Sequence, residues 1–459
     1  MRPILLRAVR LIDPASSSDL ARTDCLIVDG RIAAVGPSLA APADCEVWHH
    51  QGSVLAPAFI DLHAHLRTPG PSHTETVASG TAAAARGGFA TVCAMANTDP
   101  PLDQPRRLAD LGTHYALAGS VTVRQFAACT RGLAGREPVE VEAMADAGAV
   151  GFSDDGRNAM APAVLAELLR RAIRCQRVVA IHPEDEAVLA AANLGDPGGP
   201  SDWPRRPPEA ELAAVTTALA TLAATPGARL HLQHCSTAAV LPVIRAARRA
   251  GLGVTAEVTP HHLALTSPAG PASPAGGAAR CNPPLRGAAD RGALWAALLD
   301  GTVDAVATDH APHEPSPAES GARPSAGFSG LETALGVLLA LPDAARALPR
   351  LVAALTVGPW RVLGEAAGLP CPSLRPGAPA DCVWFDPTGV WSPAAEPQAW
   401  RSGGRNTPFW TAALGGRVLA TLRGGRPVHR WSPPPGTESG TGPGEPARDP
   451  ASATAPRRG

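Results

Sequence analysis

Apolar runs of strand length alternate with longer Ala- and Leu-rich stretches through the middle of the chain. The runs predict strands at Phe59–His65, Phe89–Met95, Tyr115–Val121, Ala149–Ser153, Arg177–Ile181, Arg229–Gln233, Gly253–Val258 and Val303–Ala307. The stretches predict helices at 74–86, 105–112, 139–147, 162–175, 209–224, 237–250, 287–299 and 331–341. Eight buried strands, each followed by a helix, are typical of a (β/α)8 barrel. A doubly wound open sheet is the alternative, but no glycine-rich phosphate turn follows the first strand.

Both ends of the chain show strand patterns of a different kind, short and separated by turns. In the N-terminal part these are Ile4–Ile12, Asp24–Val28 and Arg31–Val35, with a hairpin turn at Asp29-Gly30. After a last predicted helix at 351–364, strand patterns return at Asp381–Asp386, Arg417–Leu422 and Gly425–His429. Because chain ends often lie close together, we expect one small β-sandwich built from both ends.

These patterns divide the chain into four predicted segments. Residues 1–55 are the N-terminal part of the β-sandwich, 56–365 the barrel, 366–431 the C-terminal part of the sandwich, and 432–459 a disordered tail. Connections rich in Pro and Gly predict surface loops at Asp196–Pro208 and Ser267–Ala279, and a mobile loop over the barrel mouth at His313–Ser329.

The composition narrows the class of protein. The 459 residues are 45% hydrophobic and 18% charged, and the net charge of -1 argues against nucleic acid or an anionic membrane as partner. No apolar run approaches the roughly 20 residues that span a bilayer. The basic start, Met1–Arg7, has too short an apolar part for a signal peptide. Nine scattered cysteines without a C-x-x-C pair indicate reduced thiols. We therefore predict a cytoplasmic protein without a cysteine-based zinc site.

The chain contains no lysine, so all 40 of its basic residues are arginine. The excess of Ala, Gly, Pro and Arg indicates a coding bias toward G and C as the cause. Whatever the cause, no lysine can act as a Schiff base, a general base or a carbamylated metal ligand.

The first predicted barrel strand ends in His63, His65 and Arg67, which share one face because they occupy alternate positions. Two imidazoles and a guanidinium there would be costly without a bound partner, which favours a metal and an anionic ligand. Active-site residues of barrels lie at the carboxyl ends of the strands. Those positions add Asn97, Asp155, His182, His234, Asp309 and His313, with Asn282 in the loop after the seventh strand.

Four histidines and two aspartates from these strand ends predict a metal centre. Nitrogen and oxygen ligands without sulfur suit one or two divalent ions, above all zinc. Two ions need a ligand that bridges them. Since the chain has no lysine for this purpose, the Asp155 carboxylate is the candidate bridge, completed by a hydroxide whose pKa the metals lower.

The remaining residues of the set predict roles in catalysis and substrate binding. Asp309, at the edge of the metals, is the candidate general acid and base, the alternative being a ligand only. Arg67 and Asn97, joined by His313, suit a substrate carboxylate, although Asn97 alone would also fit a turn. We expect no site role for the histidines off the barrel mouth or on the other side of a strand, namely His49, His50, His114, His231 and His429. For the histidines near the site we expect structural roles or support of the ligands, namely His73, His261, His262 and His310.

At this point the motifs resemble those of a known family, the dihydroorotases, in particular the class I bacterial type of the amidohydrolase superfamily. The motifs are Phe59-Ile-Asp-Leu-His-Ala-His-Leu-Arg-Thr-Pro-Gly70, Ala84-Ala-Arg-Gly-Gly-Phe89, Met95-Ala-Asn-Thr98, Phe152-Ser-Asp-Asp-Gly156, Thr255-Ala-Glu-Val-Thr-Pro-His-His262, Asn282-Pro-Pro-Leu-Arg286 and Ala307-Thr-Asp-His-Ala-Pro-His313. The resemblance runs from about residue 4 to about residue 430.

The resemblance implies a binuclear zinc barrel that cyclises N-carbamoyl-L-aspartate reversibly to L-dihydroorotate in pyrimidine (UMP) synthesis. By matching motif, His63 and His65 hold the first zinc, His182 and His234 the second, Asp155 bridges, and Asp309 is both a ligand and the acid/base. The resemblance also implies substrate contacts from Arg67, Asn97, Asn282 and His313 and from the backbone at Ala326 and Gly327. A homodimer and a complex with aspartate transcarbamoylase stay open.

Four positions depart from the family pattern. Thr68 replaces an acidic residue, Ala96 a proline, Pro183 a small residue or cysteine, and Ala326 a bulkier residue. None of them removes a ligand. The alternatives are another cyclic amidase, such as a hydantoinase, dihydropyrimidinase or allantoinase, and a non-catalytic partner of aspartate transcarbamoylase. A resemblance to the hydantoinases would imply a metal site bridged by a carbamylated lysine, and this chain has no lysine. A resemblance to the non-catalytic subunits would imply loss of metal-site histidines, whereas this chain fills every ligand position.

Overall fold

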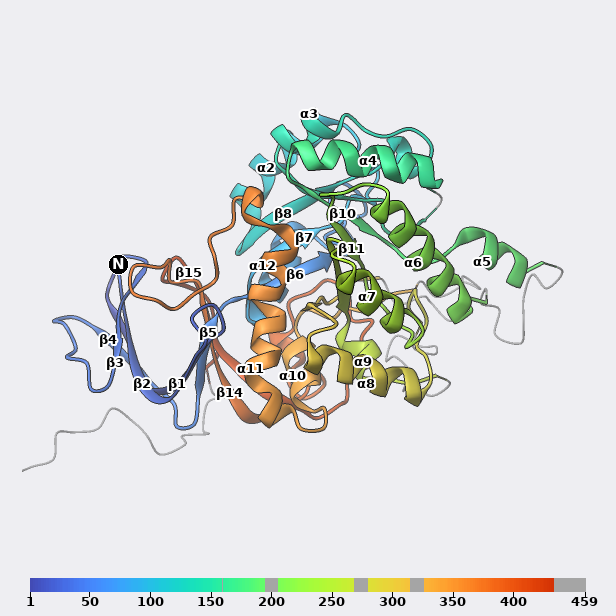
Figure 1. Cartoon of the computed structure of the whole chain (residues 1–459). Coiled ribbons are helices and arrows are strands. Elements are labelled where there is room, and N and C mark those ends of the chain that lie inside the picture. The colour runs from blue at the N-terminus through green and yellow to red at the C-terminus, as the bar shows by residue number, and fades with distance from the viewer. Residues whose placement is uncertain (159, 195–204, 268–279, 314–325, 433–459) are drawn as a thin grey trace, which may run out of the picture.

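The computed structural model describes residues 1–158, 160–194, 205–267, 280–313 and 326–432, and its strands form two separate sheets (Figure 1). One is a ring of eight parallel strands that pair in chain order, which confirms the predicted barrel. The strands are β6 (Phe59–Ala64), β7 (Phe89–Ala94), β8 (Thr122–Ala127), β9 (Ala149–Ser153), β10 (Val178–Ile181), β11 (Leu230–Leu232), β12 (Val254–Val258) and β13 (Ala305–Val306).

The barrel closes at a seam between β6 and the segment that follows β13. Within the described residues, the ladder of paired strands has its two ends at β6 and β13. Across this gap, Ala64 forms an isolated bridge with His310, and the backbone N–H of His65 donates to His310 O at 2.7 Å. The buried Asp61 carboxylate adds two bonds, from Thr308 N at 2.8 Å and Thr308 Oγ1 at 2.6 Å. Side-chain bonds therefore supplement a short backbone ladder at this seam.

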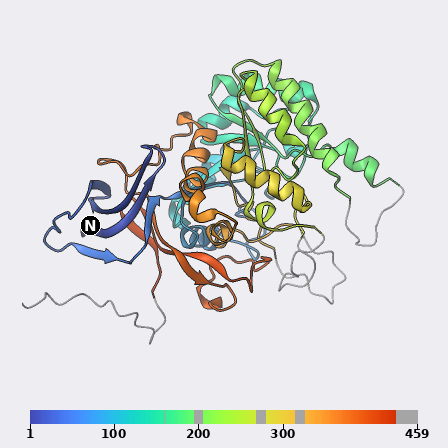
Figure 2. The same ribbon diagram turned by 60° about the horizontal axis from the view of Figure 1, so that its bottom comes forward.

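Helices connect the strands and cover the outside of the barrel (Figures 1 and 2). Their bounds are α1 Val77–Arg86, α2 Pro105–Ala118, α3 Val141–Asp146, α4 Pro162–Arg174, α5 Glu186–Ala192, α6 Pro208–Ala223, α7 Val240–Arg249, α8 Pro260–Ala264, α9 Ala288–Asp300, α10 Ala334–Leu339, α11 Ala344–Leu355 and α12 Val357–Leu363. Short 3₁₀ turns lie at Arg131–Leu133, Glu365–Ala367 and Pro397–Ala399. None of the described helices is both long enough and apolar enough to cross a membrane.

The third barrel strand was wrongly expected at Tyr115–Val121. The helix α2 continues to Ala118, and the strand β8 begins at Thr122. Leu108, Leu111 and Tyr115 are the buried residues of α2, and their spacing of three and four is that of one helical face. Tyr115 therefore completes the apolar stripe of a helix instead of starting a strand. The short helices α5 and α8 were not predicted, and α11 begins before the expected range of 351–364.

Strands from both chain ends form the second sheet, which lies to one side of the barrel (Figure 2). Antiparallel pairing of β5 with β14 joins the two ends, for example at Leu55 and Trp384, and the sheet packs around a small core of its own. The strands are β1 Ile4–Asp13, β2 Ser18–Val28, β3 Arg31–Gly36, β4 Glu46–His49, β5 Val54–Pro57, β14 Cys382–Trp391, β15 Leu414–Arg423 and β16 Arg426–Arg430.

Several predicted segments fall on residues outside the described part of the chain. They are most of the loops Asp196–Pro208, Ser267–Ala279 and His313–Ser329, and the tail after Ser432. Only the ends of these segments, such as His313 and Ala326, are described below.

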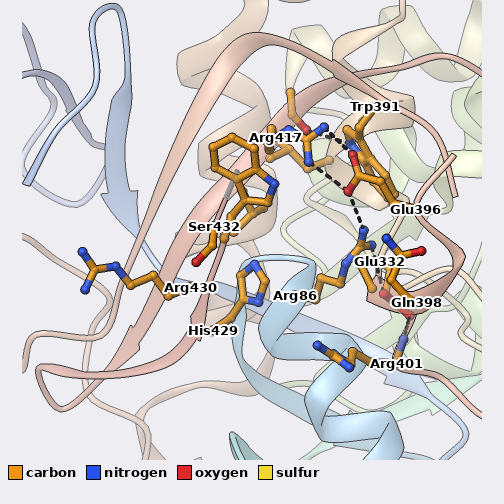
Figure 3. A pocket seen from close by; sticks show the side chains of 16 residues that line it. Arg86, Glu332, Trp391, Glu396, Gln398, Arg401, Arg417, His429, Arg430 and Ser432 are labelled. Atoms are coloured by element: carbon orange, nitrogen blue, oxygen red, sulfur yellow. Dashed lines mark hydrogen bonds and ion pairs between the residues drawn. The ribbon is translucent and has the colours of Figure 1, made fainter. Parts of the chain in front are cut away.

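A cavity of about 370 Å³ lies where β14, β15 and β16 meet α1 and α10, and none of the predicted site residues line it (Figure 3). Its floor holds a buried ion pair, in which Arg86 Nη1 donates to Glu332 Oε2 at 3.0 Å. The guanidinium also lies 4.4 Å above the ring of Trp391. Burial raises the pKa of Glu332 to about 7, although Arg86 opposes the shift. This pair ties the first barrel helix to the segment after the last barrel strand.

We expect Arg86→Met to destabilise the fold by roughly 3–5 kcal/mol, because it leaves a buried carboxylate without its cation. The loss should be larger at pH 8 than at pH 6. A carboxyl with a raised folded pKa stabilises the fold at low pH and loses that contribution as pH rises through the folded value. Without Arg86 this pKa rises further. The free energy of unfolding, measured against pH, checks the prediction. In Arg86→Met/Glu332→Gln the added pH dependence should vanish, and its persistence would contradict the assignment.

Candidate metal centre and active site

The carboxyl ends of five barrel strands bring together all six predicted metal ligands. Each of these side chains is buried, with at most 8% of its residue surface exposed. His63 lies within β6, and His65 follows two residues later. The other four lie within three residues after the ends of their strands and are Asp155 after β9, His182 after β10, His234 after β11 and Asp309 after β13.

Asp155 lies at the middle of this group. Its Oδ1 atom is 3.3 Å from His63 Nε2, 3.5 Å from His234 Nε2 and 3.7 Å from His182 Nδ1. Its Oδ2 atom is 3.5 Å from His65 Nε2. One carboxylate thus faces all four imidazoles, which is the placement that a bridging ligand requires.

Asp309 completes one half of the group from across the barrel seam. Its Oδ1 atom is 3.2 Å from His65 Nε2 and 3.5 Å from His63 Nε2. His63, His65 and Asp309 form one set of converging donor atoms, and His63, Asp155 and His234 form a second. The His182 Nδ1 atom lies 3.0 Å from His234 Nε2 in the other half.

Hydrogen bonds to the outer ring nitrogens orient three of the four histidines. His63 Nδ1 lies 3.1 Å from Glu257 Oε1, and His182 Nε2 lies 2.8 Å from Glu184 Oε2. His65 Nδ1 lies 3.0 Å from Asn97 Oδ1. Because these oxygens accept a hydrogen bond from the outer N–H, the lone pair of the other nitrogen in each neutral ring points to the centre of the group.

Asn97 has contacts within the group in addition to its predicted role as a substrate contact. Its oxygen is bound to His65, and its Nδ2 donates to Asp155 Oδ2 at 3.0 Å and to Asp155 O at 3.2 Å. The amide holds two neighbouring ligands in a fixed relation, so the structure gives it a positioning role.

The surroundings of the histidines favour positive charge at the centre of the group. Burial alone would lower the pKa of His182, but Asp155 and Glu184 raise it to about 9. Likewise burial acts against charge on Glu257, yet hydrogen bonds from His231 and His63 hold its pKa at about 2. Burial opposes ionisation of Asp155 too, and the nearby His63 keeps its pKa well below the usual range. Buried carboxylates that stay ionised would stabilise a cation among the imidazoles.

The residues present fit a divalent metal centre. His63 Nε2 and Asp155 Oδ1 are buried, face each other and have no hydrogen-bond partner, and they point to the middle of the group. Unpaired polar atoms of this kind are costly unless an ion or water lies between them. The donor set is four imidazole nitrogens and two carboxylates without sulfur, which suits zinc and similar ions.

Three residues of the group have left-handed backbone angles that are unusual for residues with a side chain. The φ angles are 53° at Arg67, 32° at His234 and 47° at Asp309. Each residue lies just beyond a strand end, where the chain turns to bring its side chain to the mouth of the barrel. Strained backbone of this kind costs about 1–3 kcal/mol per residue and clusters at functional sites.

A cavity of about 280 Å³ opens beside the group, with His65, Arg67, Asn97 and His313 among its lining residues. Arg67 Nε donates to Pro312 O at 3.3 Å, and its Nη2 lies 3.3 Å from His313 Nε2. That imidazole nitrogen already donates to Ala326 O at 2.7 Å. It therefore cannot also accept from Arg67, whose outer N–H groups remain available to an anion in the cavity.

The predicted contacts at Asn282, Ala326 and Gly327 lie at the ends of described segments. Asn282 Oδ1 is buried without a hydrogen-bond partner. Gly327 has a φ of 126°, and a Cβ there would lie 2.5 Å from Ala311 Cβ, so glycine is needed. Asn406 holds this region, since its Nδ2 donates to Gly327 O at 2.9 Å and its Oδ1 accepts from His313 N at 3.0 Å.

Asp154, next to Asp155, points away from the histidines. Its carboxylate accepts from Cys129 N at 2.7 Å and Thr130 N at 3.1 Å, and also from Thr130 Oγ1. It therefore ties the end of β9 to the end of β8. The two ring nitrogens of His231 are bound to Glu257 and Thr255, so His231 is not one of the converging ligands.

Five side chains that support the group or the adjoining cavity were not assigned roles from the sequence. Glu257 lies within the motif Thr255–His262 and Glu184 follows His182 by two residues, so carboxylates near histidines were the available signal. Arg206 Nε donates to Glu184 Oε2 at 2.9 Å, and Gln233 Nε2 lies 3.2 Å from His63 Nδ1. Asn406 carries no local signal, because it comes from the far C-terminal part of the chain.

We expect Glu257→Gln to weaken metal binding by about 10- to 100-fold while the fold persists, because the neutral amide holds the His63 ring less firmly. The Kd for zinc, measured by competition with a chelator, checks this. His231 also binds Glu257, through Oε2, but is not one of the six predicted metal ligands. His231→Gln is therefore the matched control and should change the Kd much less. Equal losses in both variants would contradict the assignment.

Comparisons with known proteins agree on one family. The Dihydro-orotase-like family model matches residues 52–201. The chain is 41% identical to a protein named dihydroorotase from Anaeromyxobacter dehalogenans, covering 93% of this chain and 98% of that one. It is 40% identical to a dihydroorotase from Thermus aquaticus, over 93% of this chain and 99% of that one.

Solved structures show the same fold at lower identity. The L-hydantoinase (dihydropyrimidinase) from Arthrobacter aurescens is 23% identical, with a TM-score of 0.82 over 94% of this chain and 96% of that one. The dihydropyrimidinase from Brevibacillus agri is 23% identical, with a TM-score of 0.77 over 93% and 95%. At these identities the likeness concerns the fold alone.

Proposed function

Because the chain belongs to the dihydroorotase family, we propose that it is a zinc-dependent dihydroorotase that interconverts N-carbamoyl-L-aspartate and L-dihydroorotate. The observation that supports this most directly is the pairing of two features at one barrel mouth. A buried group of four histidines and two aspartates lies beside a cavity, and the Arg67 guanidinium is among the groups that line that cavity. The first suits activation of water at a cyclic amide, and the second suits a substrate carboxylate.

The proposed reaction assigns distinct tasks to residues of this chain. In the hydrolytic direction, Asp309 accepts a proton from the attacking water and passes it to the ring nitrogen that leaves. Arg67 binds the carboxylate of dihydroorotate with two parallel N–H bonds and so fixes the ring beside Asp309. His63, His65, Asp155, His182 and His234, with Asp309, would hold the zinc ions. When bound, the ions would polarise the water and the carbonyl that it attacks.

The test of this proposal is an assay of purified, zinc-loaded protein in both directions. We expect hydrolysis of L-dihydroorotate and formation of it from N-carbamoyl-L-aspartate, with little turnover of dihydrouracil, hydantoin or allantoin. Good turnover of a ring without a carboxylate, together with none of dihydroorotate, would replace the proposal with a hydantoinase-type activity. The structural likeness to hydantoinases makes this the rival to exclude.

The absence of lysine argues against that rival on chemical grounds. A carbamylated lysine cannot form in this chain, and Asp155 already faces all four histidines. A non-catalytic subunit is disfavoured because every ligand position is filled and buried.

We expect Arg67→Met to lower kcat/KM for dihydroorotate by about 10- to 100-fold, since a charged hydrogen bond is worth roughly 1.5–3 kcal/mol. Dihydrouracil lacks the carboxylate and provides the internal control. Its slow turnover should not fall, so the preference for the acidic ring should shrink. A parallel fall for both rings would mean that Arg67 supports the site without reading the carboxylate.

The proposal extends to a pair of zinc ions bridged by Asp155, to a place in pyrimidine synthesis and to a cytoplasmic location. All nine cysteines are free, six of them buried, which supports a reducing compartment. Metal analysis of the isolated protein tests the zinc content. Light scattering, alone and with aspartate transcarbamoylase, tests for a homodimer and for that complex.

A further inference from the structure

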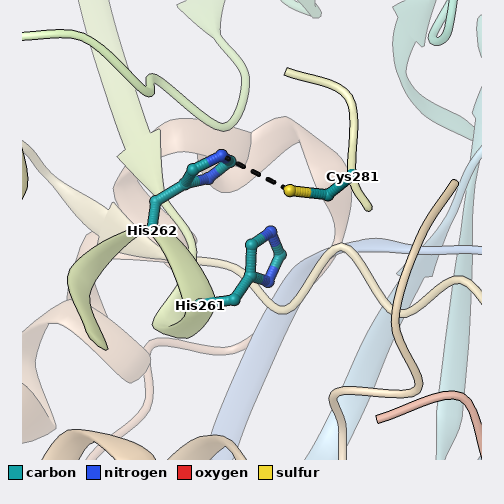
Figure 4. A group of neighbouring side chains, drawn as sticks. All are labelled: His261, His262 and Cys281. Atoms are coloured by element: carbon teal, nitrogen blue, oxygen red, sulfur yellow. Dashed lines mark hydrogen bonds between the residues drawn. The ribbon is translucent and has the colours of Figure 1, made fainter. Parts of the chain in front are cut away.

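Three buried side chains with metal-binding atoms lie together outside the six-residue centre. His261 and His262 belong to α8, which follows β12, and Cys281 directly precedes Asn282 (Figure 4). Their exposed fractions are 3%, 3% and 1%. One nitrogen of each ring and the Cys281 Sγ atom all lie within 4.8 Å of one another.

The geometry is close to that of a tetrahedral metal site. Cys281 Sγ is 3.9 Å from His262 Nε2. Metal bonds of about 2.3 Å to sulfur and about 2.0 Å to nitrogen place such ligand atoms roughly 3.5 Å apart. The three ligand atoms therefore need to approach one another by less than about 1.5 Å, which rotation of the side chains can supply.

His261 supplies the observation that points to a missing ligand. Its Nε2 atom is buried and has no hydrogen-bond partner. In Figure 4 its ring turns its outer edge to the space between His262 and Cys281. An imidazole nitrogen buried in this way loses its hydrogen bond to water without replacement. Burial also lowers the pKa of His261 to about 4, so the ring is neutral at physiological pH and its lone pair is free to bind a cation.

Apolar side chains close the space from the other side. Phe328 packs edge-on against His261, with ring centroids 5.1 Å apart, and forms one apolar cluster with Cys281 and Leu285. A low dielectric and a thiol favour soft or borderline cations over Mg²⁺ and Ca²⁺, which prefer oxygen.

We propose that His261, His262 and Cys281 form an additional site for a single thiophilic cation of the Zn²⁺ or Cd²⁺ class. On binding, the Cys281 thiol loses its proton to solvent and the thiolate sulfur bonds to the metal. His261 binds through the Nε2 lone pair. His262 now binds Pro283 O through Nε2 at 3.0 Å and Thr259 Oγ1 through Nδ1 at 2.8 Å. The ring changes tautomer, so that Nε2 gives up its proton and bonds to the metal while Nδ1 carries a proton and donates a hydrogen bond to Thr259 Oγ1. Water completes the fourth position.

This site is separate from the six-residue centre in composition. The two share no residue, and the centre has no sulfur ligand among its members. A sulfur ligand is therefore a spectroscopic label for the additional site alone, whatever the enzyme catalyses.

The experiment loads the metal-free protein with Co²⁺, which takes zinc sites and absorbs in the near ultraviolet when bound to thiolate. We expect a thiolate-to-cobalt charge-transfer band in the native chain and about one more bound Co²⁺ than in Cys281→Ala, which should lack the band. Cys382→Ala removes a thiol equally buried in the other sheet, and Cys371→Ala removes the exposed one. Both controls should keep the band. Circular dichroism confirms that each variant is folded.

Two outcomes would overturn the additional site. One is no charge-transfer band in the native chain, and the other is a band that survives in Cys281→Ala. His261→Gln adds a test of the nitrogen ligand, because binding by a thiol alone would leave its cobalt affinity unchanged. Dihydroorotate hydrolysis, measured with zinc on the native chain, tests the proposed function independently of the band, so failure of the one and failure of the other are distinguishable.

Discussion

Replacement of Asp309 by asparagine should lower kcat by about 10²- to 10⁴-fold, the range that general acid–base catalysis contributes. The amide keeps the size of the carboxylate and an oxygen that can face His63 and His65, but it cannot accept the proton of the attacking water. Burial opposes ionisation of Asp309, yet the neighbouring His63 holds its pKa below the usual range. A base is thus present at neutral pH. KM should change far less than kcat.

The measurement pairs steady-state kinetics with metal analysis. Asp309 is also a candidate ligand, so loss of metal could mimic loss of the base. A variant that retains the metal of the native chain but has lost turnover isolates the proton transfer. An intact kcat would rule out Asp309 as the acid and base.

Replacement of Asp155 by alanine should remove most of the bound zinc and, with it, the activity. Its Oδ1 and Oδ2 atoms are the ones that face all four histidines, at 3.3–3.7 Å. Without them, the two halves of the group have no common ligand, and four imidazoles in a buried space lose the negative charge that supports a cation.

The neighbouring carboxylate supplies the matched control. Asp154 binds the backbone N–H groups of Cys129 and Thr130 and faces away from the histidines. Asp154→Ala should therefore lower the free energy of unfolding and keep its zinc, as measured by denaturation and metal analysis. If Asp154→Ala lost zinc and Asp155→Ala kept it, the bridging role would pass to Asp154.

Much of the centre was predictable because a parallel barrel converts order in the sequence into proximity. Residues at or just beyond the carboxyl ends of buried strands meet at one end of the ring, so reading strand ends was enough to gather His63, Asp155, His234 and Asp309. An error in a helix boundary, as at Tyr115, left this result intact because no ligand lies on β8.

The sequence was less informative about the hydrogen-bond partners of the individual side chains in the site. Asn97 follows a strand just as the ligands do, and only the distances show that its amide joins His65 to Asp155. Glu257 lies inside a strand, where a buried carboxylate is hard to tell from a strand-end group before the pairing partners are known. Asn406 reaches His313 and Gly327 from the C-terminal part of the chain, a contact that depends on tertiary structure alone.

Because the metal ligands come from both sides of the barrel seam, bound metal would also stabilise the closed barrel. His63 and His65 lie on one side of it and Asp309 on the other, while the backbone contributes a single bridge there among the described residues. Ions held by both sides would act as a cross-link between the first strand and the segment after the last. Removal of metal should then speed amide hydrogen exchange at Ala64, His65 and His310 before it affects β9 or β10. The barrel would therefore open first at the seam between β6 and the segment after β13.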